Sequence, residues 1–446
     1  MRRNPTESST TVVRESPLVS IITVNYNGAR YLPVLLEALA AQTYPRFEVH
    51  VVDNGSTDDS IALLERDFPW VKITRASENL GFAGGNNLGI ARARGAFFAL
   101  INNDTVPDPD WLRHLVAAAL ESPQIAGVGS KILFARPFLP VRLEAQGSDG
   151  VPVSPPADDA RSGIFLSNLS AFAGCSYRKP VFDAGFHGPP ELDGQRGGWI
   201  ADRATIFLPV ESLESPGTLE LRLSAPSVPE PPRLAVSIGD TEIGRIQVAP
   251  SWQDHRFPVP PELGRRAGFD LINNAASFLK PDGAAGDRGI FQPDRGQYDS
   301  PEDVEALCGC AMLLSRQALE QAGAFDRDFF MYFEDSELSW RLRKRGFRLR
   351  YQPKSVVRHF HASTTVEWSP LFNFHVARNR ILMLIKHAAP LVVLRAYLAE
   401  LAVLLHLLRA YRSLRHVEVR TRLKIQLSLV RNAPRALLKR LGLLAH

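Results

Sequence analysis

Two neighbouring acids, Glu334 and Asp335, occupy the position in this sequence that best suits proton transfer. They follow an aromatic run, FFMYF at residues 329–333, and open a predicted helix that ends at Gly346. A carboxylate beside aromatic side chains is poorly hydrated, which raises its pKa and suits it to act as a general base. At a helix start, the same pair can instead complement the helix macrodipole. The pattern alone leaves both interpretations open.

Polar residues also cluster where predicted strands end. Apolar segments at 18–24, 47–52, 71–74 and 96–101 alternate with segments of helical spacing, which predicts a doubly wound α/β sheet. Such sheets bind ligands at the carboxyl ends of their strands. Asn, Asp and Gly also form ordinary turns, so one cluster would decide nothing, but four clusters at one edge favour a binding site. The clusters are Asn25 and Asn27, Asp53 and Asn54, Asn86 and Asn87, and Asn102 to Asp104.

The glycine-rich segment GFAGGNN at residues 81–87 excludes two common nucleotide sites. It lacks the spacing of a GxGxxG dinucleotide fingerprint, and it lacks the GK[ST] ending of a Walker A loop. A nicotinamide enzyme and a P-loop ATPase are therefore disfavoured.

Five ordered motifs carry a resemblance to a known family. The sequence resembles the family 2 glycosyltransferases, particularly their bacterial rhamnosyltransferase-like branch. The resemblance covers about residues 18–134 and 304–379, less than half of the chain. The motifs are NYNG (25–28), VVDNGSTDDS (51–60), NLGFAGGNNLG (79–89), LINNDT (100–105) and FFMYFEDSELSWRLRKRGFRLRY (329–351).

The resemblance implies a GT-A nucleotide-sugar-binding domain and a metal-assisted, inverting transfer. It places Asn25 and Asp53 on the nucleotide, with Asp53 at the base, and Asn86 along the sugar nucleotide. The favoured donor is a dTDP-deoxysugar such as dTDP-rhamnose, and UDP-galactofuranose or another UDP-sugar is the alternative. The implied acceptor is a lipid-linked or cell-surface polysaccharide.

The metal-binding DxD element of the family corresponds here to Asn102, Asn103 and Asp104. Asn103 and Asp104 are thereby implied to contact the donor, and Asp104 is the one carboxylate ligand left for Mg²⁺ or Mn²⁺. An amide oxygen at the first position is still a hard donor atom. A histidine shortly after the acid pair completes the metal site in related enzymes. His359 is the candidate by spacing, with His361 in reserve.

The resemblance assigns the general base to the second acid, Asp335. This carboxylate would take the proton of the acceptor hydroxyl as its oxygen attacks the anomeric carbon opposite the leaving group. Glu334 would orient the acceptor or the base. Downstream in the same helix, Arg341 and Arg345 have two equal interpretations, as phosphate ligands or as solvated surface residues.

Residues 136–300 form a different kind of structure, since 20 of the 33 prolines lie there. Alternating segments at 218–225 and 234–249, the latter with a Gly239-Asp240 turn, predict an inserted, jelly-roll-like β-sandwich. Its aromatic residues are expected in the core. The alternative is a glycan-binding module, in which Trp199 and Arg203 would be the first residues to test. The aromatic residues are Trp199, Phe207, Trp252, Phe257 and Phe278.

The tail, residues 376–446, carries 14 Lys and Arg against two Glu, a local balance of +12 in a chain of net charge +5. Leucines at helical spacing from Leu391 to Leu408 predict amphipathic helices. Arg395, Glu400 and His406 argue against a membrane span. The basic, apolar tail favours a peripheral anchor on an anionic membrane. The alternative is a helical hairpin packed on the catalytic domain or on a second subunit of a homo-oligomer. No nucleic-acid-reading motif accompanies the basic residues.

These observations predict five segments: a disordered lead without a secretory pattern (1–17), a divided GT-A domain (18–135 and 301–375), the insert (136–300) and the tail (376–446). Three cysteines are too few for a disulfide framework and fit a reducing compartment. The predicted protein is a cytoplasmic-face glycosyltransferase. The hypothesis from another class is a non-catalytic glycan-binding scaffold, which the Asn at position 102 supports. Asp104, Asp335 and His359 oppose it.

Overall fold

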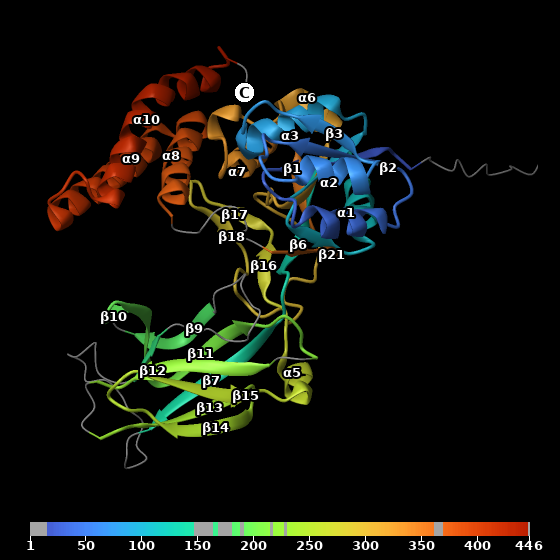
Figure 1. The fold of residues 1–446 in the computed structure, drawn as a ribbon. Helices are drawn as coiled ribbons and strands as arrows, with labels where there is room; N and C mark the ends of the chain where they lie inside the picture. The colour runs from blue at the N-terminus through green and yellow to red at the C-terminus, as the bar shows by residue number, and fades with distance from the viewer. Residues whose placement is uncertain are drawn as a thin grey trace, which may run out of the picture.

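The computed structural model describes most of the chain, in seven segments. Its described residues are 16–146, 164–167, 181–187, 191–214, 217–226, 230–360 and 369–444. The predicted lead and the reserve metal ligand His361 lie outside the described residues, except for residues 16 and 17. Figure 1 shows an α/β domain with a layer of helices, α8 to α10, at its side and an all-β insert joined to it by β6, β7 and β16.

The α/β domain is built on a ten-stranded sheet. Eight of its strands follow the order β19-β21-β6-β20-β4-β1-β2-β3, while β16 pairs with β6 and β5 pairs with β21. β1 pairs in parallel with β2 and β4, and β2 with β3, as expected from buried, β-branched segments. β20 is antiparallel to both β4 and β6, so the sheet is mixed. The strands are β1 (Val19–Asn25), β2 (Phe47–Asp53), β3 (Lys72–Arg75), β4 (Phe97–Ile101), β5 (Thr105–Pro107), β6 (Ile125–Phe134), β16 (Ile272–Ala275), β19 (Glu302–Asp303), β20 (Ala311–Ser315) and β21 (Arg348–His359).

Helices cover both faces of this sheet and bury two apolar cores. One core joins α1 and α4 through residues such as Leu36 and Trp111; the other joins Phe98 to Leu342 of α7. These two cores hold the strands in place, so that their carboxyl ends form one edge. The helices of this domain are α1 (Leu32–Ala40), α2 (Ser60–Asp67), α3 (Gly81–Arg92), α4 (Trp111–Ala119), α6 (Arg316–Ala322), η1 (Arg327–Phe329) and α7 (Glu334–Lys344).

The insert is the antiparallel β structure that the alternating pattern predicts. All its strands belong to one nine-stranded sheet, which folds over a single apolar core. The two end strands approach each other: a Cβ on Gly244 would lie 2.6 Å from the Phe257 ring. The elements are β7 (Phe138–Gln146), β8 (Ile164–Ser167), β9 (Val181–His187), β10 (Glu191–Leu192), β11 (Gln195–Pro209), β12 (Thr218–Ser224), β13 (Arg233–Ile238), β14 (Thr241–Gln247), β15 (Gln253–Pro258) and α5 (Pro261–Ala267).

The aromatic residues of the insert are mainly core residues, as expected. Trp199 is buried, and its ring packs edge-on against Phe165 with 5.1 Å between the ring centroids. Trp199 therefore cannot serve as a glycan-stacking platform. Phe278 is the exception. It lies outside the insert, on β17 (Ser277–Leu279), which pairs with β18 (Ala285–Asp287) in a separate hairpin.

The chain returns to the sheet of the α/β domain soon after α5. β16 pairs with β6, and β19 pairs with β21. Although 272–303 lies largely within the segment expected to belong to the insert, its strands extend that sheet or flank it. This return places residues such as Asn273 beside the end of β21, which matters for the site described below.

The tail packs on the α/β domain through buried ion pairs. It consists of α8 (Pro370–His387), α9 (Pro390–Tyr411) and α10 (Val417–Arg440). Lys386 of α8 and Lys439 of α10 both bind Asp326, at 2.8 and 2.5 Å, and Lys439 also binds Asp328 at 2.7 Å. Removing one partner from such a buried network leaves an uncompensated charge and costs about 3–5 kcal/mol. The packing on the catalytic domain is the alternative that the sequence analysis left open.

α9 nevertheless exposes one apolar face. Leu391, Leu394, Leu398 and Leu405 are each about half exposed, whereas Ala396 and Leu404 are buried against the other helices. Among the described residues, α9 is also the one helix that is long and apolar enough to cross a membrane, by length and composition only. Its acid Glu400 pairs with Arg422 of α10 at 2.6 Å.

Candidate active site

Asn25 and Asn103 meet at the carboxyl edge of the sheet. Asn25 ends β1, and its Oδ1 accepts a hydrogen bond of 2.9 Å from Nδ2 of Asn103, which follows β4. Both side chains are buried. The backbone of Gly28 lies against this pair, because a Cβ there would fall 2.2 Å from Asn103 Nδ2 and 2.3 Å from Asn25 Oδ1. The pair therefore shapes the loop after β1, and the glycine of the NYNG motif is required by close packing.

Asp53 ends β2 and offers a carboxylate oxygen toward the same edge. The side chain is 5% exposed, and Ser56 N donates to Oδ2 at 3.4 Å. Within the described residues, Oδ1 is buried and has no hydrogen-bond partner. A buried, unpaired carboxylate oxygen is costly unless a ligand satisfies it. The geometry suits a donor group of a nucleotide, such as a base N–H or a ribose hydroxyl.

Two asparagines of α3 use their side chains in hydrogen bonds to the protein backbone. Asn86 Nδ2 donates to Phe82 O at 3.0 Å within the helix. Asn87 bridges to Phe325, since its Nδ2 donates to Phe325 O at 2.7 Å and its Oδ1 accepts from Phe325 N at 3.0 Å. Asn87 thus links the two halves of the domain. Asn86 is buried at the predicted edge of the sheet, and its amide nitrogen is already hydrogen-bonded.

Asp104 and His359 form the candidate metal site. Their Oδ1 and Nε2 atoms lie 3.2 Å apart, and both side chains are largely buried. Phe360 N also donates to Asp104 O at 2.9 Å, which joins the end of β21 to the residues after β4. The structure therefore brings together two predicted ligands that lie in different halves of the domain.

The donor atoms of Asp104 and His359 suit a divalent cation whose remaining ligands would come from a diphosphate. Among the described residues no group of three or more His, Cys, Asp or Glu side chains gathers as a metal site. Mg²⁺ and Mn²⁺ are commonly held by one or two protein ligands together with substrate phosphates and water, and carboxylate oxygen and imidazole nitrogen suit Mn²⁺. Asp104 and His359 would hold such a cation.

Asn273, which the sequence analysis missed, orients His359. Its Oδ1 lies 2.8 Å from His359 Nδ1, in a buried contact from the return strand β16. Because Asn273 presents its carbonyl oxygen to Nδ1, the contact fixes the orientation of the ring and turns Nε2 toward Asp104. No local sequence signal marks Asn273, because its partner is 86 residues away.

Replacing Asn273 by leucine is expected to lower Mn²⁺ affinity by about 10- to 100-fold, the usual loss when a group that orients a metal ligand is removed. Titration calorimetry with Mn²⁺ in the presence of UDP would measure this. Asn274→Ala is the matched control, since Asn274 bonds instead to Ser277 and Asp287, and its affinity should change at most a few-fold. Equal losses in both variants would assign Asn273 to folding alone.

Asp335 is positioned by backbone donors at the start of α7. Gly309 N donates to Oδ2 at 2.9 Å, and Ser336 N donates to Oδ1 at 2.6 Å. Burial nevertheless raises the pKa of Asp335, and the hydrogen bonds from Gly309 and Ser336 only partly oppose this effect. The side chain keeps a partly exposed edge. A carboxylate with a raised pKa and open lone pairs has the chemistry of a general base.

Glu334 is more buried than Asp335 and less well satisfied. Burial, followed by the neighbouring charge of Asp335, raises its pKa well above the usual range. Its Oε2 is buried and has no hydrogen-bond partner among the described residues. Two adjacent acids with raised pKa values titrate as a coupled pair.

A short segment before β20 links the two halves of the site. Gly309 binds Asp335, and the next residue, Cys310, accepts a hydrogen bond of 2.9 Å from Asn102 N. The acid pair of α7 and the residues after β4 therefore flank the same two residues of chain, which places Asp335 and Asp104 at one edge of the sheet. The insert does not separate them.

The aromatic loop before the acids has an unusual backbone. Phe330, Tyr332 and Phe333 have φ values of 64°, 65° and 70°. Such left-handed conformations in residues other than glycine cost about 1–3 kcal/mol each and need support from their surroundings. Asn379 of α8 provides it: its Nδ2 lies 2.8 Å from the carbonyl oxygens of Phe329, Met331 and Tyr332. Asn379 is fully buried.

Arg341 is neither a phosphate ligand nor a solvated surface residue, so both interpretations of the sequence analysis are wrong. Its guanidinium is buried, donates to Ala322 O at 2.6 Å and Ala324 O at 2.7 Å, and pairs with Glu337 at 2.9 Å. The residue closes the end of α6 onto α7. Arg345, at the end of α7, is exposed.

Two family models match this chain, each over a separate segment. Residues 20–139 match the family described as Glycosyl transferase family 2, and residues 291–379 match Glycosyltransferase like family 2. An uncharacterized glycosyltransferase of Haemophilus influenzae is 32% identical over 117 residues, which are 26% of this chain and 36% of the relative. The O-antigen biosynthesis protein RfbC of Myxococcus xanthus is 40% identical over 127 residues, 27% of this chain and 10% of RfbC. The chain thus spans about a third or less of these relatives.

Solved structures show more distant similarity. The mannosyltransferase PcManGT from Pyrobaculum calidifontis, in complex with GDP-Man and Mn²⁺, has 15% identity and a TM-score of 0.40, with 96% of this chain and 81% of that chain covered. GalNAc-T7 with UDP, GalNAc and Mn²⁺ has 12% identity and a TM-score of 0.45, with 84% and 48% covered.

Proposed function

Since the chain carries a family 2 glycosyltransferase domain of GT-A fold in two segments, residues 20–139 and 291–379, we propose that it transfers a sugar, with inversion, from a nucleoside diphosphate donor to an acceptor hydroxyl. The observation that supports this most strongly is the shared segment Gly309-Cys310. It binds Asp335 on one side and the residues before Asp104 on the other. A base and a diphosphate site can therefore act on one bond.

The proposed mechanism assigns a role to each group at this edge. Asp53 Oδ1 accepts a hydrogen bond from the nucleotide, because it is buried and unpaired among the described residues. A divalent cation held by Asp104 and His359 would stabilise the charge that develops on the leaving diphosphate. Asp335, held through Gly309 and Ser336, accepts the proton of the acceptor hydroxyl on the face opposite the leaving group.

We propose a polysaccharide or lipid-linked acceptor and a rhamnose-like donor. The Myxococcus xanthus relative is an O-antigen biosynthesis protein by name, which supports a cell-envelope polysaccharide as the acceptor. The five motifs favour a dTDP-deoxysugar, and a UDP-sugar is the alternative. Contacts with one or two hydroxyl groups can redirect donor choice.

A donor panel tests the proposed function. The purified protein is incubated with dTDP- and UDP-sugars in Mg²⁺ or Mn²⁺, and thermal stabilisation and donor hydrolysis are measured. We expect cation-dependent stabilisation by one class of donor, lost in Asp104→Asn. No stabilisation by any nucleotide sugar would favour the non-catalytic scaffold, in which the insert carries the function.

We also propose that the protein lies on the cytoplasmic face of a membrane. The exposed leucines of α9 support this, together with exposed cations such as Arg409, Arg412 and Arg415.

Changing Leu391, Leu394 and Leu398 together to serine is expected to lower binding to anionic vesicles at least tenfold. Burial of each leucine contributes about 1.5 kcal/mol or more. Co-sedimentation measures the bound fraction. Leu120→Ser, at an exposed leucine of the catalytic domain, is the control and should bind normally. Unchanged binding of the triple variant would dismiss α9 as the anchor.

A further inference from the structure

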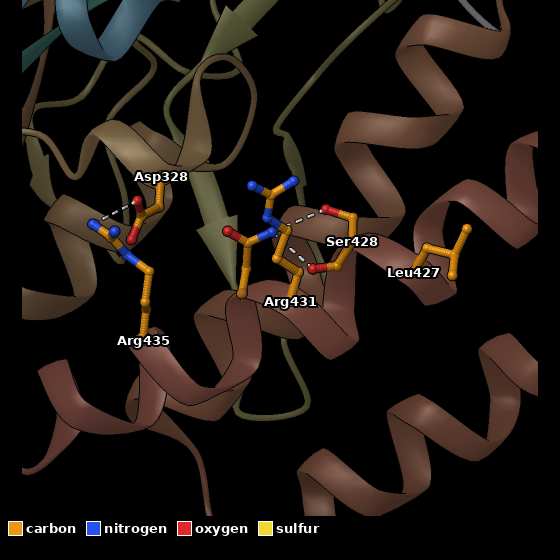
Figure 2. A pocket seen from close by; sticks show the side chains of 6 residues that line it. Asp328, Leu427, Ser428, Arg431 and Arg435 are labelled. Atoms are coloured by element: carbon orange, nitrogen blue, oxygen red, sulfur yellow. Dashed lines mark hydrogen bonds and ion pairs between the residues drawn. The ribbon is translucent and has the colours of Figure 1, made fainter.

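A polar pocket lies between η1 and α10, away from the acids and strand ends described above. Its volume is about 550 Å³, and Figure 2 shows its lining side chains, with Asp328 facing Arg435. Five of the six lining residues belong to α10, and two of these are arginines one turn apart. The lining residues are Asp328, Leu427, Ser428, Arg431, Asn432 and Arg435.

Asp328, the acid that lines the pocket, does not neutralise both of its arginines. Within the described part of the chain, the Arg431 guanidinium has no hydrogen-bond or ion-pair partner. Arg435 approaches Asp328 Oδ1 only at 3.5 Å and is 60% exposed. Asp328 Oδ2 is already bound by Lys439 at 2.7 Å. The pocket therefore offers two guanidinium groups, which suit the oxygen atoms of a phosphate.

Ser428, one turn before Arg431 on α10, adds a neutral donor to the pocket. Its Oγ accepts hydrogen bonds from Arg378 Nε at 2.8 Å and from Asn432 Nδ2 at 3.2 Å. With both lone pairs of the hydroxyl engaged, its hydrogen is available for an oxygen atom of a ligand. The pocket thus combines charged and neutral donors of the kind that phosphate groups require.

One lining residue of the pocket is apolar and exposed. Leu427 is 72% exposed. A free phosphate would gain nothing from this side chain, whereas a phosphate that is attached to a hydrocarbon chain would bury it. The ligand chemistry that matches both features is an amphiphilic phosphate.

Hydrogen bonds connect this pocket to the catalytic loop. Arg378, which binds Ser428, also donates to Asp328 O at 2.8 Å and to Asn379 Oδ1 at 2.6 Å. Asn379 in turn holds the aromatic loop that precedes Glu334 and Asp335. A group bound at Arg431 and Arg435 therefore lies on the framework that positions the acids.

We infer that this pocket binds the phosphate or diphosphate group of a lipid-linked acceptor, an inference that rests on the proposed function. The arginines and Ser428 bind the phosphate oxygens, and Leu427 contacts the start of the lipid chain. The pocket differs from the α9 face, which associates with the membrane without selecting a headgroup.

The test compares two double variants with equal charge changes on α10. Arg431→Gln with Arg435→Gln alters the pocket, and Arg420→Gln with Lys424→Gln alters exposed cations outside it. Vesicles of phosphatidylcholine are prepared alone, with phosphatidylglycerol, or with a small fraction of polyprenyl phosphate, and binding is measured by co-sedimentation. Sodium diphosphate is titrated separately, with thermal stability as the readout.

We expect polyprenyl phosphate to strengthen binding of the parent protein and of the control variant. The pocket variant should lose this gain, by about tenfold or more, while keeping its melting temperature within a few degrees. Equal losses in both variants, or no loss in either, would overturn the inference. So would saturation of the pocket by sodium diphosphate without preference for polyprenyl phosphate vesicles, which would make the ligand a soluble phosphate. Donor hydrolysis without acceptor should persist in the pocket variant, so failure here is distinguishable from failure of the proposed glycosyl transfer.

Discussion

Asp335→Asn is expected to lower the rate of sugar transfer by about 10³-fold, within the range that general base catalysis contributes. The amide can still accept the hydrogen bond from Gly309, so the start of α7 should keep its geometry. Donor affinity should remain within a few-fold, because Asp335 acts on the acceptor side. Steady-state transfer rates and donor titration measure the two quantities separately.

Glu334→Gln is the informative comparison, because it changes the adjacent acid by the same chemistry. A smaller loss than in Asp335→Asn is expected, since Glu334 is more buried and lies beside the base. If Glu334→Gln abolishes transfer while Asp335→Asn retains it, the base has been assigned to the wrong acid.

Transfer should also depend on pH in a direction that the environment of Asp335 determines. Burial raises the pKa of Asp335 above that of an ordinary aspartate, and a base works only in its deprotonated form. The value of kcat/KM should therefore fall as the pH decreases through this raised pKa, at a higher pH than for an exposed carboxylate. The acidic limb of this profile belongs to the coupled acid pair. Burial and the charge of Asp335 raise the pKa of Glu334 further, so Glu334 is already protonated where Asp335 titrates, and Glu334→Gln should leave the limb close to its original pH.

Asn379→Ala is expected to destabilise the fold by about 3 kcal/mol or more and to lower transfer at least 100-fold at temperatures where the protein is folded. The substitution leaves three carbonyl groups without their shared donor, and unsatisfied buried polar groups cost about 1–3 kcal/mol each. The loop with three positive φ values would then relax and displace Glu334 and Asp335.

Chemical denaturation measures the stability loss, and transfer assays on the folded fraction measure the activity loss. Asn432→Ala is the control for the stability measurement alone, since this asparagine bonds to Ser428 within its own helix. It should cost less than about 1 kcal/mol, the usual value of one exposed or half-exposed hydrogen bond. Full activity in Asn379→Ala would show that the aromatic loop keeps its shape without the hydrogen bonds from Asn379.

Local patterns in the sequence were sufficient for the framework of the site. Strands such as β1 and β2 and the helix α7 have periodicities that a few consecutive residues define, and the parallel pairing of β1, β2 and β4 follows from their buried character. The polar residues that follow these strands must share one edge for the same reason. Asn25, Asp53 and Asp104 therefore lie where they were expected, and their proposed roles remain to be tested.

Only the tertiary structure determined which partners complete the site. Asn273 meets His359 across 86 residues, and Lys439 meets Asp326 across 113 residues, both through a return of the chain that no local pattern encodes. The contacts of Asn379, of Arg341 and of the tail also join residues that are distant in the sequence. Each polar side chain could bond to several chemically equivalent groups along the chain. The folding of the insert and of α8 to α10 around the catalytic sheet selects one of them, because a buried polar group is stable only where its hydrogen bonds are satisfied.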